Sequence, residues 1–455
     1  MSEQSIQYTL PLDLPSEKSA HAKCSHVISN NSNTIDPKDR AIHEWYRFVL
    51  SYPPHLVRDY IRDFELDEQS VILDPFCGTG TTLVEARMNH IRAIGLEANP
   101  FPQFASAVKT DWSVSPTELK SFAEQVSEST CTELANHGID DWQLAFKPTV
   151  KLRSLDQYAM RALIKNSISP LPLHKTLVLL DQINKYKLVQ VHKYGILALG
   201  NALIKTIGNL RFGPEVGVGK IKIDVPVVAT WKHEIDRMVS DLESLYGNSY
   251  PNVDVFLADA RKQTHVIEEK SIDAVITSPP YPNEKDYTRT TRLESVVLGF
   301  IKNMSDLRSF KKTLLRSNTR GVYKTDSDDK WVSDIKEIQL LASTIEQRRI
   351  ELGKTSGFEK MYARVTKQYF GGMARHLSEL TRILRPGAKL AYVVGDQASY
   401  LRVMIRTGQI LADIADRQGY QVERIDLFRT RFATATKKEL REEVVVLRWP
   451  GTTAT

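Results

Sequence analysis

A short strand, a glycine turn and a helix start follow one another near residue 80. The apolar run Val71–Leu73 ends in Asp74, the turn that follows contains Gly78 and Gly80, and a helix begins at Leu83. The glycines let the backbone approach a bound ligand, because no Cβ stands in the way. This order predicts the first half of a nucleotide-binding βαβ unit and therefore an α/β fold.

The turn is unsuited to a dinucleotide. The dinucleotide fingerprint needs a third glycine near Leu83, where none stands, and the carboxylate of Asp74 would repel a pyrophosphate. A cationic ligand that carries an amino acid fits better, because Asp74 would face an ammonium or sulfonium group.

Two further strands end in carboxylates. Ala93–Glu97 ends in Glu97, which is placed to accept both hydroxyls of a ribose. The strand that begins at Val253 ends near Asp259, which is placed to accept from an adenine amino group. Ribose, adenine and a charged amino-acid tail together indicate S-adenosylmethionine.

A different kind of site follows the strand Ile272–Thr277, where the chain reads Ser278-Pro279-Pro280-Tyr281. Ligands bind at the carboxyl ends of strands in open α/β sheets. The two prolines have no N–H, so the carbonyls before them are free to accept other hydrogen bonds. Acceptors beside the flat ring of a tyrosine suit an exocyclic amino group on a planar base.

The tetrad, the glycine turn and the strand ends together resemble the amino-group DNA methyltransferases that carry a Ser-Pro-Pro-Tyr motif. The likeness covers most of residues 40–110 and 250–450, including Leu384–Asp396 and Arg441–Leu447. It implies a Rossmann-like class I S-adenosylmethionine-dependent methyltransferase fold, with a seven-stranded mixed sheet and helical insertions. It also implies methyl transfer to the N4 amine of a flipped cytosine in double-stranded DNA, without a metal.

The resemblance assigns roles to individual residues. Ser278 and the Pro279 carbonyl would accept the hydrogens of the amine, and Tyr281 would stack on the base. Tyr52 and Pro53 lie in a segment similar to the one that closes over the methionine end of the cofactor. The expected catalytic residues are Ser278, Pro279, Pro280 and Tyr281, and the expected cofactor contacts are Tyr52, Pro53, Asp74, Pro75, Phe76, Gly78, Gly80, Thr81, Glu97, Ala98, Asp259 and Ala260.

Several alternatives stay open. A serine in the first position of the tetrad favours cytosine N4, whereas adenine N6 enzymes more often carry Asp or Asn there. The glycine turn precedes the tetrad, an order that tRNA guanine-N2 methyltransferases share. A non-catalytic, cofactor-binding recognition subunit is the third alternative. Cys77, inside the turn, is interpreted as a small packing residue rather than a nucleophile.

The chain divides into four stretches by composition and length. Residues 1–38, rich in Ser and Asn, predict a flexible arm, and 39–111 with 251–450 form the catalytic domain. Residues 112–250 are too long for a loop and predict a mainly helical insertion with outer DNA contacts. Its last helix, from Trp231, is expected to pack back on the sheet. Residues 282–370 are a basic second insertion, expected near the flipped base.

Composition sets the remaining bounds. The chain has 455 residues, of which 42% are hydrophobic and 25% charged, as in soluble globular proteins. Three cysteines are too few for a metal or disulfide framework, and no apolar run or secretory pattern suggests a membrane, so we expect a cytoplasmic, nucleoid-associated protein. We also expect a role in restriction-modification or phage defence, with a separately encoded restriction endonuclease as a candidate partner.

Basic residues gather in two stretches that predict either phosphate contacts or solvated surfaces. The first consists of Lys302, Arg308, Lys311, Lys312, Arg316, Arg320 and Lys324, and the second of Arg429, Arg431, Lys437, Lys438 and Arg441.

Overall fold

A seven-stranded sheet organises the molecule. The computed structural model describes residues 28–451 apart from 31, 33, 49–50, 143–148, 214, 284 and 434–437, so residues 1–27 of the predicted arm lie outside it. The strands are β1 Val71–Asp74, β2 Arg92–Glu97, β5 Val253–Leu257, β6 Ile272–Thr277, β7 Leu384–Gly395, β8 Gln421–Ala433 and β9 Lys438–Arg448. Their order is β5-β2-β1-β6-β7-β9-β8, and β9 runs in the opposite direction to the other six strands. The predicted class I fold with a mixed sheet is confirmed.

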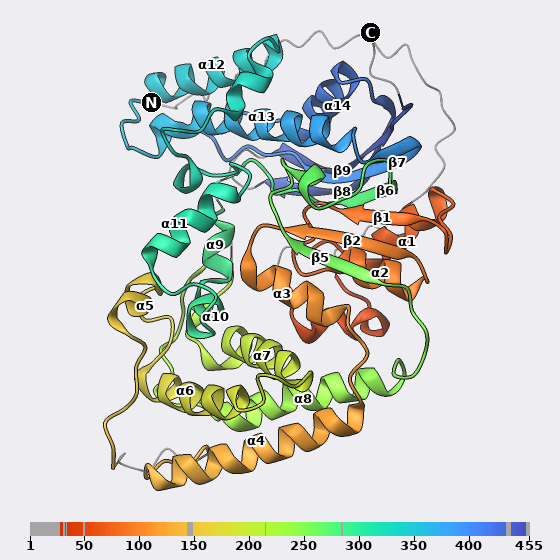
Figure 1. The fold of residues 1–455 in the computed structure, drawn as a ribbon. Helices are drawn as coiled ribbons and strands as arrows, with labels where there is room; N and C mark the ends of the chain where they lie inside the picture. Colours follow the sequence, from red (N-terminus) through yellow and green to blue (C-terminus); the bar gives the residue numbers. More distant parts are fainter. Residues whose placement is uncertain are drawn as a thin grey trace.

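Helices cover both faces of this sheet, as the apolar strands require. On one face lie α1 Pro54–Asp63 and α2 Thr81–Met88, which share a core with Ile72 and Ala274. On the other lie α12 Lys336–Glu351, α13 Tyr362–Leu380 and α14 Thr407–Arg417, packed on alternate strand residues such as Leu73 and Val275 (Figure 1). Because successive strand residues point to opposite faces, both cores draw on the same strands.

A second helical layer lies outside α3, as Figure 1 shows. It consists of α4 Pro116–Asn136, α6 Pro170–Asn184, α7 Val191–Ala202 and α8 Val227–Glu243, with the short α5 Gln157–Ala162 at one end. These five helices lie within the stretch 112–250, for which the sequence predicts a mainly helical insertion. The four longer helices share one apolar core with α3 Pro100–Lys109, whereas the buried residues of α5 form a smaller cluster with Val296, Ile301 and Leu307. Helix α7 continues into a π-helical turn at Leu203–Ile207.

The prediction that the helix from Trp231 packs on the sheet is wrong. This helix, α8, packs against α4 and α7, and the Trp231 indole donates to the Gly195 carbonyl of α7 at 2.9 Å. Its apolar core cluster contains no residue of the seven-stranded sheet. The physical reason is that α2 and α3 already cover that face, so the apolar side of α8 is buried one layer further out.

The chain between β6 and β7 forms short helices before α12 and α13. These are α9 Tyr287–Thr290, α10 Arg292–Val297, α11 Met304–Thr313 and the 3-10 turns η5 Thr319–Gly321, η6 Asp328–Val332 and η7 Glu359–Met361. Further 3-10 turns are η1 Pro37–Asp39, η2 His43–Trp45 and η4 Gln263–His265, and β3 Leu210–Arg211 pairs with β4 Gly217–Val218.

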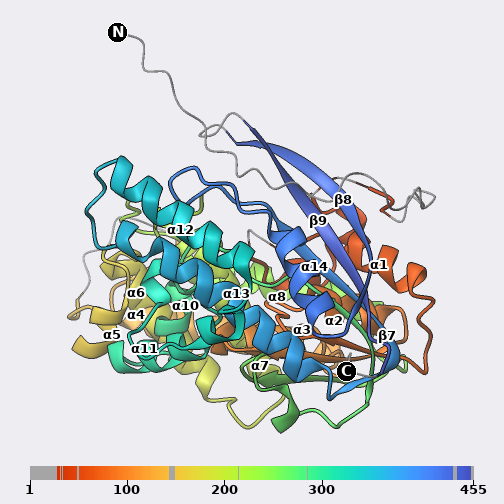
Figure 2. The same cartoon turned by 90° about the horizontal axis from the view of Figure 1, so that it is seen from above.

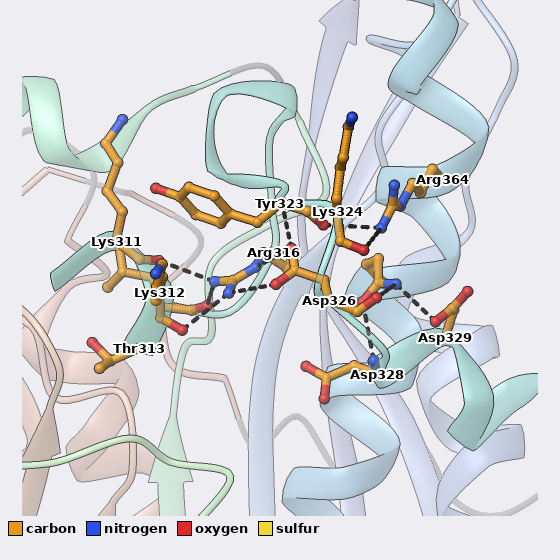
Figure 3. A network of polar contacts seen from close by, with 12 residues as sticks. Lys311, Lys312, Thr313, Arg316, Tyr323, Lys324, Asp326, Asp328, Asp329 and Arg364 are labelled. Carbon is orange, nitrogen blue, oxygen red and sulfur yellow. Dashed lines mark hydrogen bonds and ion pairs between the residues drawn. The ribbon is translucent and has the colours of Figure 1, made fainter. Parts of the chain in front are cut away.

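Arg316 organises the segment after α11 (Figure 3). Its guanidinium binds both oxygens of Asp326 at 2.8 and 2.9 Å, and it donates to the carbonyls of Lys311 and Lys312 at 3.0 Å each. Lys311 binds Asp286 at 2.8 Å. Lys311 and Arg316 of the first basic stretch are therefore paired with carboxylates, whereas Lys302, Arg308, Lys312, Arg320 and Lys324 are exposed.

The second basic stretch lies on the β8–β9 ribbon. Pairing of β7 with β9 stops at Gly395 and Glu442, whereas β8 and β9 continue to the pair Ala433 and Lys438, and the ribbon extends past the body of the sheet (Figure 2). Arg429 binds Glu442 at 2.6 Å and Arg441 binds Glu443 at 2.8 Å. Lys437 lies outside the described residues. No helix among the residues described has the length and apolarity needed to cross a membrane.

Two consecutive glycines of α13 let the segment 313–328 lie directly on that helix. A Cβ at Gly371 would stand 1.9 Å from the carbonyl oxygen of Asp328, and one at Gly372 would stand 2.4 Å from Leu315 Cδ1. The close approach is possible only without side chains at these positions.

We expect Gly371→Ala to destabilise the protein by about 1–3 kcal/mol, because forcing atoms into a closed contact outweighs the better helix propensity of alanine. Thermal unfolding of the purified variant measures this. Gly357→Ala is the matched control, since no atom lies within 4 Å of its Cβ position. Equal melting temperatures of the two variants would contradict the close approach.

Candidate active site

The ends of β1 and β6 meet at the centre of the sheet. These strands are parallel neighbours, with Leu73 opposite Val275, so their carboxyl ends lie at one edge. The Thr277 hydroxyl donates to Asp74 Oδ1 at 2.6 Å. The strand order changes direction between β1 and β6, which is where ligands bind in open α/β sheets. The tetrad and the glycine turn therefore begin side by side.

The backbone of the glycine turn adopts a conformation that favours glycine at two positions. Gly78 and Gly80 have φ values of 52° and 82°, in the left-handed region. The Gly78 N–H donates to Glu97 Oε2 at 3.0 Å, and the Asn99 N–H donates to Glu97 Oε1 at 2.7 Å. Loss of hydration raises the pKa of Glu97 to about 7. The turn and the end of β2 are thus held together by one carboxylate.

Asp74 is fully buried and connects three segments. Besides Thr277, it accepts from the Phe76 N–H at 3.1 Å and from the Tyr52 hydroxyl at 3.2 Å. Burial raises the pKa of this carboxyl to about 6, although each of these hydrogen bonds favours the ionised form. In this structure Asp74 fixes the start of the glycine turn through these hydrogen bonds.

One cavity of about 830 Å³ connects the predicted sites. Of the predicted residues, its wall includes Tyr52, Pro75, Phe76, Gly78, Thr81, Glu97, Ala98, Asp259, Ala260, Ser278, Pro279, Pro280 and Tyr281. Pro53, Asp74 and Gly80 are not part of the wall. Pro53 precedes α1, and Gly80 is the residue that precedes the first turn of α2.

The tetrad is held by β7. Ser278 Oγ donates to the Val393 carbonyl at 3.1 Å. Because a carbonyl only accepts, this contact uses the hydroxyl hydrogen and leaves lone pairs on the serine oxygen. A Cβ at Gly395 would stand 3.0 Å from Tyr281 Cε2, so the ring lies against glycine backbone. Burial raises the pKa of the Tyr281 hydroxyl, which keeps the phenol neutral.

Lys109 is a residue that the sequence analysis missed. It is buried in α3, and its ammonium donates to the carbonyl of Thr79 at 2.7 Å and to that of Tyr46 at 3.2 Å. Burial lowers the pKa of this amine to about 7. It ties the glycine turn to the segment before α1. The sequence holds no signal for this role, because the lysine stands among apolar residues of a helix.

Asp259 has a partner two residues along the chain, which the sequence analysis also missed. Arg261 donates from Nε to Oδ1 at 2.9 Å and from Nη2 to Oδ2 at 2.8 Å. The Arg261 backbone N–H donates to Oδ1 at 3.0 Å. An arginine two positions after a strand-end carboxylate is a signal that could have been noted.

Segments that are distant in the sequence from the glycine turn and the tetrad complete the cavity. Ile204, Lys205 and Phe212 come from the mainly helical stretch 112–250, and Arg429 and Glu442 come from the β8–β9 ribbon. No periodicity in the sequence places these residues near the tetrad, because the approach depends on how whole layers pack.

Cys77 has no features of a nucleophile. Its thiol is buried in the apolar cluster that includes Leu83, with Ser106 Oγ at 3.9 Å, and burial raises the pKa of the thiol. Within the described ranges, no group of three or more His, Cys, Asp and Glu residues is arranged to hold a metal ion.

The chain is similar to known proteins around the glycine turn and over most of its length. The profile of a family described as DNA methylase (N6_N4_Mtase) matches residues 18–103, which include Tyr52, the glycine turn and Glu97. The chain is 24% identical to Type II methyltransferase M.BsoBI of Geobacillus stearothermophilus, over 90% of this chain and 85% of that protein. It is 25% identical to Type II methyltransferase M.AvaI of a Nostoc species, over 93% and 89%. It is 23% identical to Type II methyltransferase M.MvaI of Kocuria varians, over 86% and 87%.

These similarities support an amino-methyltransferase family, described as DNA methylase, for the chain. The family profile covers the part of the chain that contains the glycine turn. The similarity to the relatives extends across the tetrad and across the stretches 112–250 and 282–370.

Glu97 makes the stability of this methyltransferase depend on pH. Its pKa rises from 4.5 to about 7 on folding, so between these values the native state holds a proton that the unfolded chain releases. The free energy of unfolding therefore falls as the pH rises through this window, by on the order of 1–3 kcal/mol.

We expect Glu97→Gln to remove this fall, since glutamine does not titrate. The melting temperature of the variant minus that of the wild type should increase between about pH 5 and about pH 8. Glu124→Gln, at an exposed position of α4, is the control and should show a constant difference. A constant difference for Glu97→Gln as well would show that Glu97 ionises normally.

Proposed function

We propose that this methyltransferase transfers a methyl group from S-adenosylmethionine to the exocyclic N4 amine of a cytosine flipped out of double-stranded DNA. The observation that carries the proposal is the contact of Thr277 with Asp74 at 2.6 Å, because it brings the tetrad and the glycine turn to one cavity. A transferase needs its donor and its acceptor within reach of each other, and one shared cavity meets this need.

The donor set in the cavity fits S-adenosylmethionine. The two oxygens of Glu97 would accept ribose hydroxyls, and Asp259 would accept from the adenine amino group. Asp259 Oδ1 accepts hydrogen bonds from two nitrogens of Arg261, whereas Oδ2 accepts a hydrogen bond from one. Oδ2 therefore keeps one lone pair for a ligand. The bound cofactor supplies a methyl group on a positively charged sulfur.

The role of the tetrad is to activate the acceptor amine. The lone pair of an exocyclic amine is delocalised into the ring, so the nitrogen must become pyramidal before it can react. The Ser278 hydroxyl donates a hydrogen bond to the Val393 carbonyl and therefore presents lone pairs to the amine, and the Pro279 carbonyl is a second acceptor. Hydrogen bonds from the amine to these oxygens favour the pyramidal geometry by preorganised electrostatics.

Tyr281 would stack on the extruded base. A base within a duplex cannot reach a cavity below the sheet edge, so it must leave the stack. The Tyr281 ring lies against Gly395, which fixes its plane at the end of β7. The hydroxyl stays neutral because burial raises its pKa, so the ring does not carry a charge next to the cofactor.

Cytosine is proposed over adenine because the tetrad begins with serine. The resemblance to Ser-Pro-Pro-Tyr enzymes supports this choice. The names of the three relatives describe Type II methyltransferases, and this supports a role in restriction-modification with a separately encoded endonuclease.

Nucleoside mass spectrometry of DNA from cells that express the chain tests the base. We expect N4-methylcytosine with the wild type, and a fall in methylation rate of roughly 100-fold for Ser278→Ala, because it removes one preorganised contact to the amine. Ser343→Ala is the control, since Ser343 on α12 also donates to a carbonyl but lies outside the cavity. N6-methyladenine would assign the other base, and no modified base in DNA would favour an RNA substrate.

The exposed basic residues after α10 are proposed to contact DNA phosphates. Lys324 is the cleanest probe, because its side chain points away from the Arg316 network and only its carbonyl takes part in a hydrogen bond (Figure 3). Neighbouring residues of this segment, among them Lys311 and Asn318, line the cavity, so DNA bound there would be near the tetrad.

We expect Lys324→Ala to weaken binding to duplex DNA and to lower the slope of log K against log salt by about 1, because one phosphate contact is lost. Fluorescence anisotropy at several salt concentrations measures the slope. Lys270→Ala, at an exposed position before the start of β6 and so at the opposite end of the strand from the tetrad, should leave it unchanged. An unchanged slope for Lys324→Ala would place the DNA elsewhere.

A further inference from the structure

Arg261 contacts both the proposed adenine acceptor and the segment that carries the exposed basic residues. Its guanidinium holds Asp259 through two parallel hydrogen bonds at 2.9 and 2.8 Å. Its third nitrogen, Nη1, binds Asp328 Oδ2 at 2.5 Å. All five donors of an arginine lie in one plane, so these contacts fix the two carboxylates relative to each other.

The same side chain also reaches the end of α11. Nη2 donates to the carbonyl of Thr313 at 3.2 Å and to that of Lys312 at 3.4 Å. Arg261 is only 6% exposed and Asp328 only 7%. A buried guanidinium is stable only with all of its donors satisfied, so movement of any one partner costs free energy at the others.

Asp328 and the end of α11 belong to one rigid unit. Arg316 joins the Lys312 carbonyl to Asp326, Gln368 of α13 accepts from the Asp328 N–H at 3.1 Å, and the missing side chain of Gly371 lets Asp328 lie on α13. Figure 3 shows Arg316 between Lys311, Lys312 and Asp326, with Asp328 further along the same segment. The exposed Lys312, Arg320 and Lys324 stand on the same unit.

We propose that Arg261 is a positioning residue that couples nucleoside binding at Asp259 to DNA binding by the segment 311–328. The inference rests on the proposed function, since it takes S-adenosylmethionine and DNA as the two ligands. A nucleoside that donates to the free lone pair of Asp259 Oδ2 restrains the carboxylate, which restrains Arg261 and, through Asp328 and the two carbonyls, the DNA-binding segment. Coupling of this kind is reciprocal, so DNA strengthens nucleoside binding by the same factor.

The test measures the coupling factor, defined as the dissociation constant for DNA without S-adenosylhomocysteine divided by the constant with it. The DNA is a short duplex that contains the sequence methylated by the wild type. We expect a factor of about fivefold or more for the wild type, and close to one for Arg261→Lys. Lysine keeps the charge but cannot bind Asp259 in two places and reach Asp328 at once.

A second variant tests the contact of Arg261 with Asp328 separately from its contact with Asp259. Asp328→Asn removes the charge at the segment but leaves the contact of Arg261 with Asp259, so the affinity for S-adenosylhomocysteine alone should stay close to that of the wild type. The coupling factor should fall. A purely structural role of Asp328 would change both affinities and leave their ratio unchanged. Arg385→Lys, which breaks a 2.6 Å pair with Asp273 at the opposite end of the strands, is the control.

The outcomes distinguish the inference from the proposed function. If the wild type binds both ligands but Arg261→Lys and Asp328→Asn keep its coupling factor, or if the wild-type factor is one, Arg261 does not couple the sites and the inference is overturned alone. If the wild type binds S-adenosylhomocysteine but no DNA, the proposed function fails and the inference fails with it.

Discussion

The hydrogen bond between Thr277 and Asp74 is the contact on which the site depends. It joins the last residue of β6 to the last residue of β1, at the position where the strand order changes direction. The tetrad begins one residue after Thr277, and the glycine turn begins one residue after Asp74. Because both loops start at this contact, two segments some 200 residues apart in the chain line a single cavity.

This arrangement has an electrostatic cost. Asp74 and Glu97 have their pKa values raised to about 6 and about 7, and Lys109 has its pKa lowered to about 7, in each case mainly by loss of hydration. Three ionisable groups around the glycine turn thus oppose folding when they are charged. The backbone N–H and carbonyl groups of the turn offset part of this cost. Ionisable groups with shifted pKa values are common at functional sites, where they serve ligand binding or catalysis rather than the stability of the apo fold.

The helical stretch 112–250 is joined to the sheet domain by a shared core. Phe101 of α3 packs against α7 so closely that a Cβ at Gly200 would stand 2.4 Å from its ring. Through the π-helical turn at the end of α7, Ile204 and Lys205 reach the cavity wall. The stretch therefore contributes residues to the cavity itself.

The sequence alone determined the fold class and the two central loops, because both depend on local chemistry. A strand, a Gly-x-Gly turn and a helix must follow one another, and two prolines after an apolar strand must free their preceding carbonyls. Helices in 112–250 were predicted for the same reason, from apolar spacing. Only the tertiary structure decided that α8 packs on α4 and α7, that Arg261 joins Asp259 to Asp328, that Lys109 supports the turn and that Arg316 is internal while Lys324 is exposed. These contacts connect residues distant in the chain. A side chain's charge or polarity does not reveal its partner, because that depends on which layers come together around the sheet.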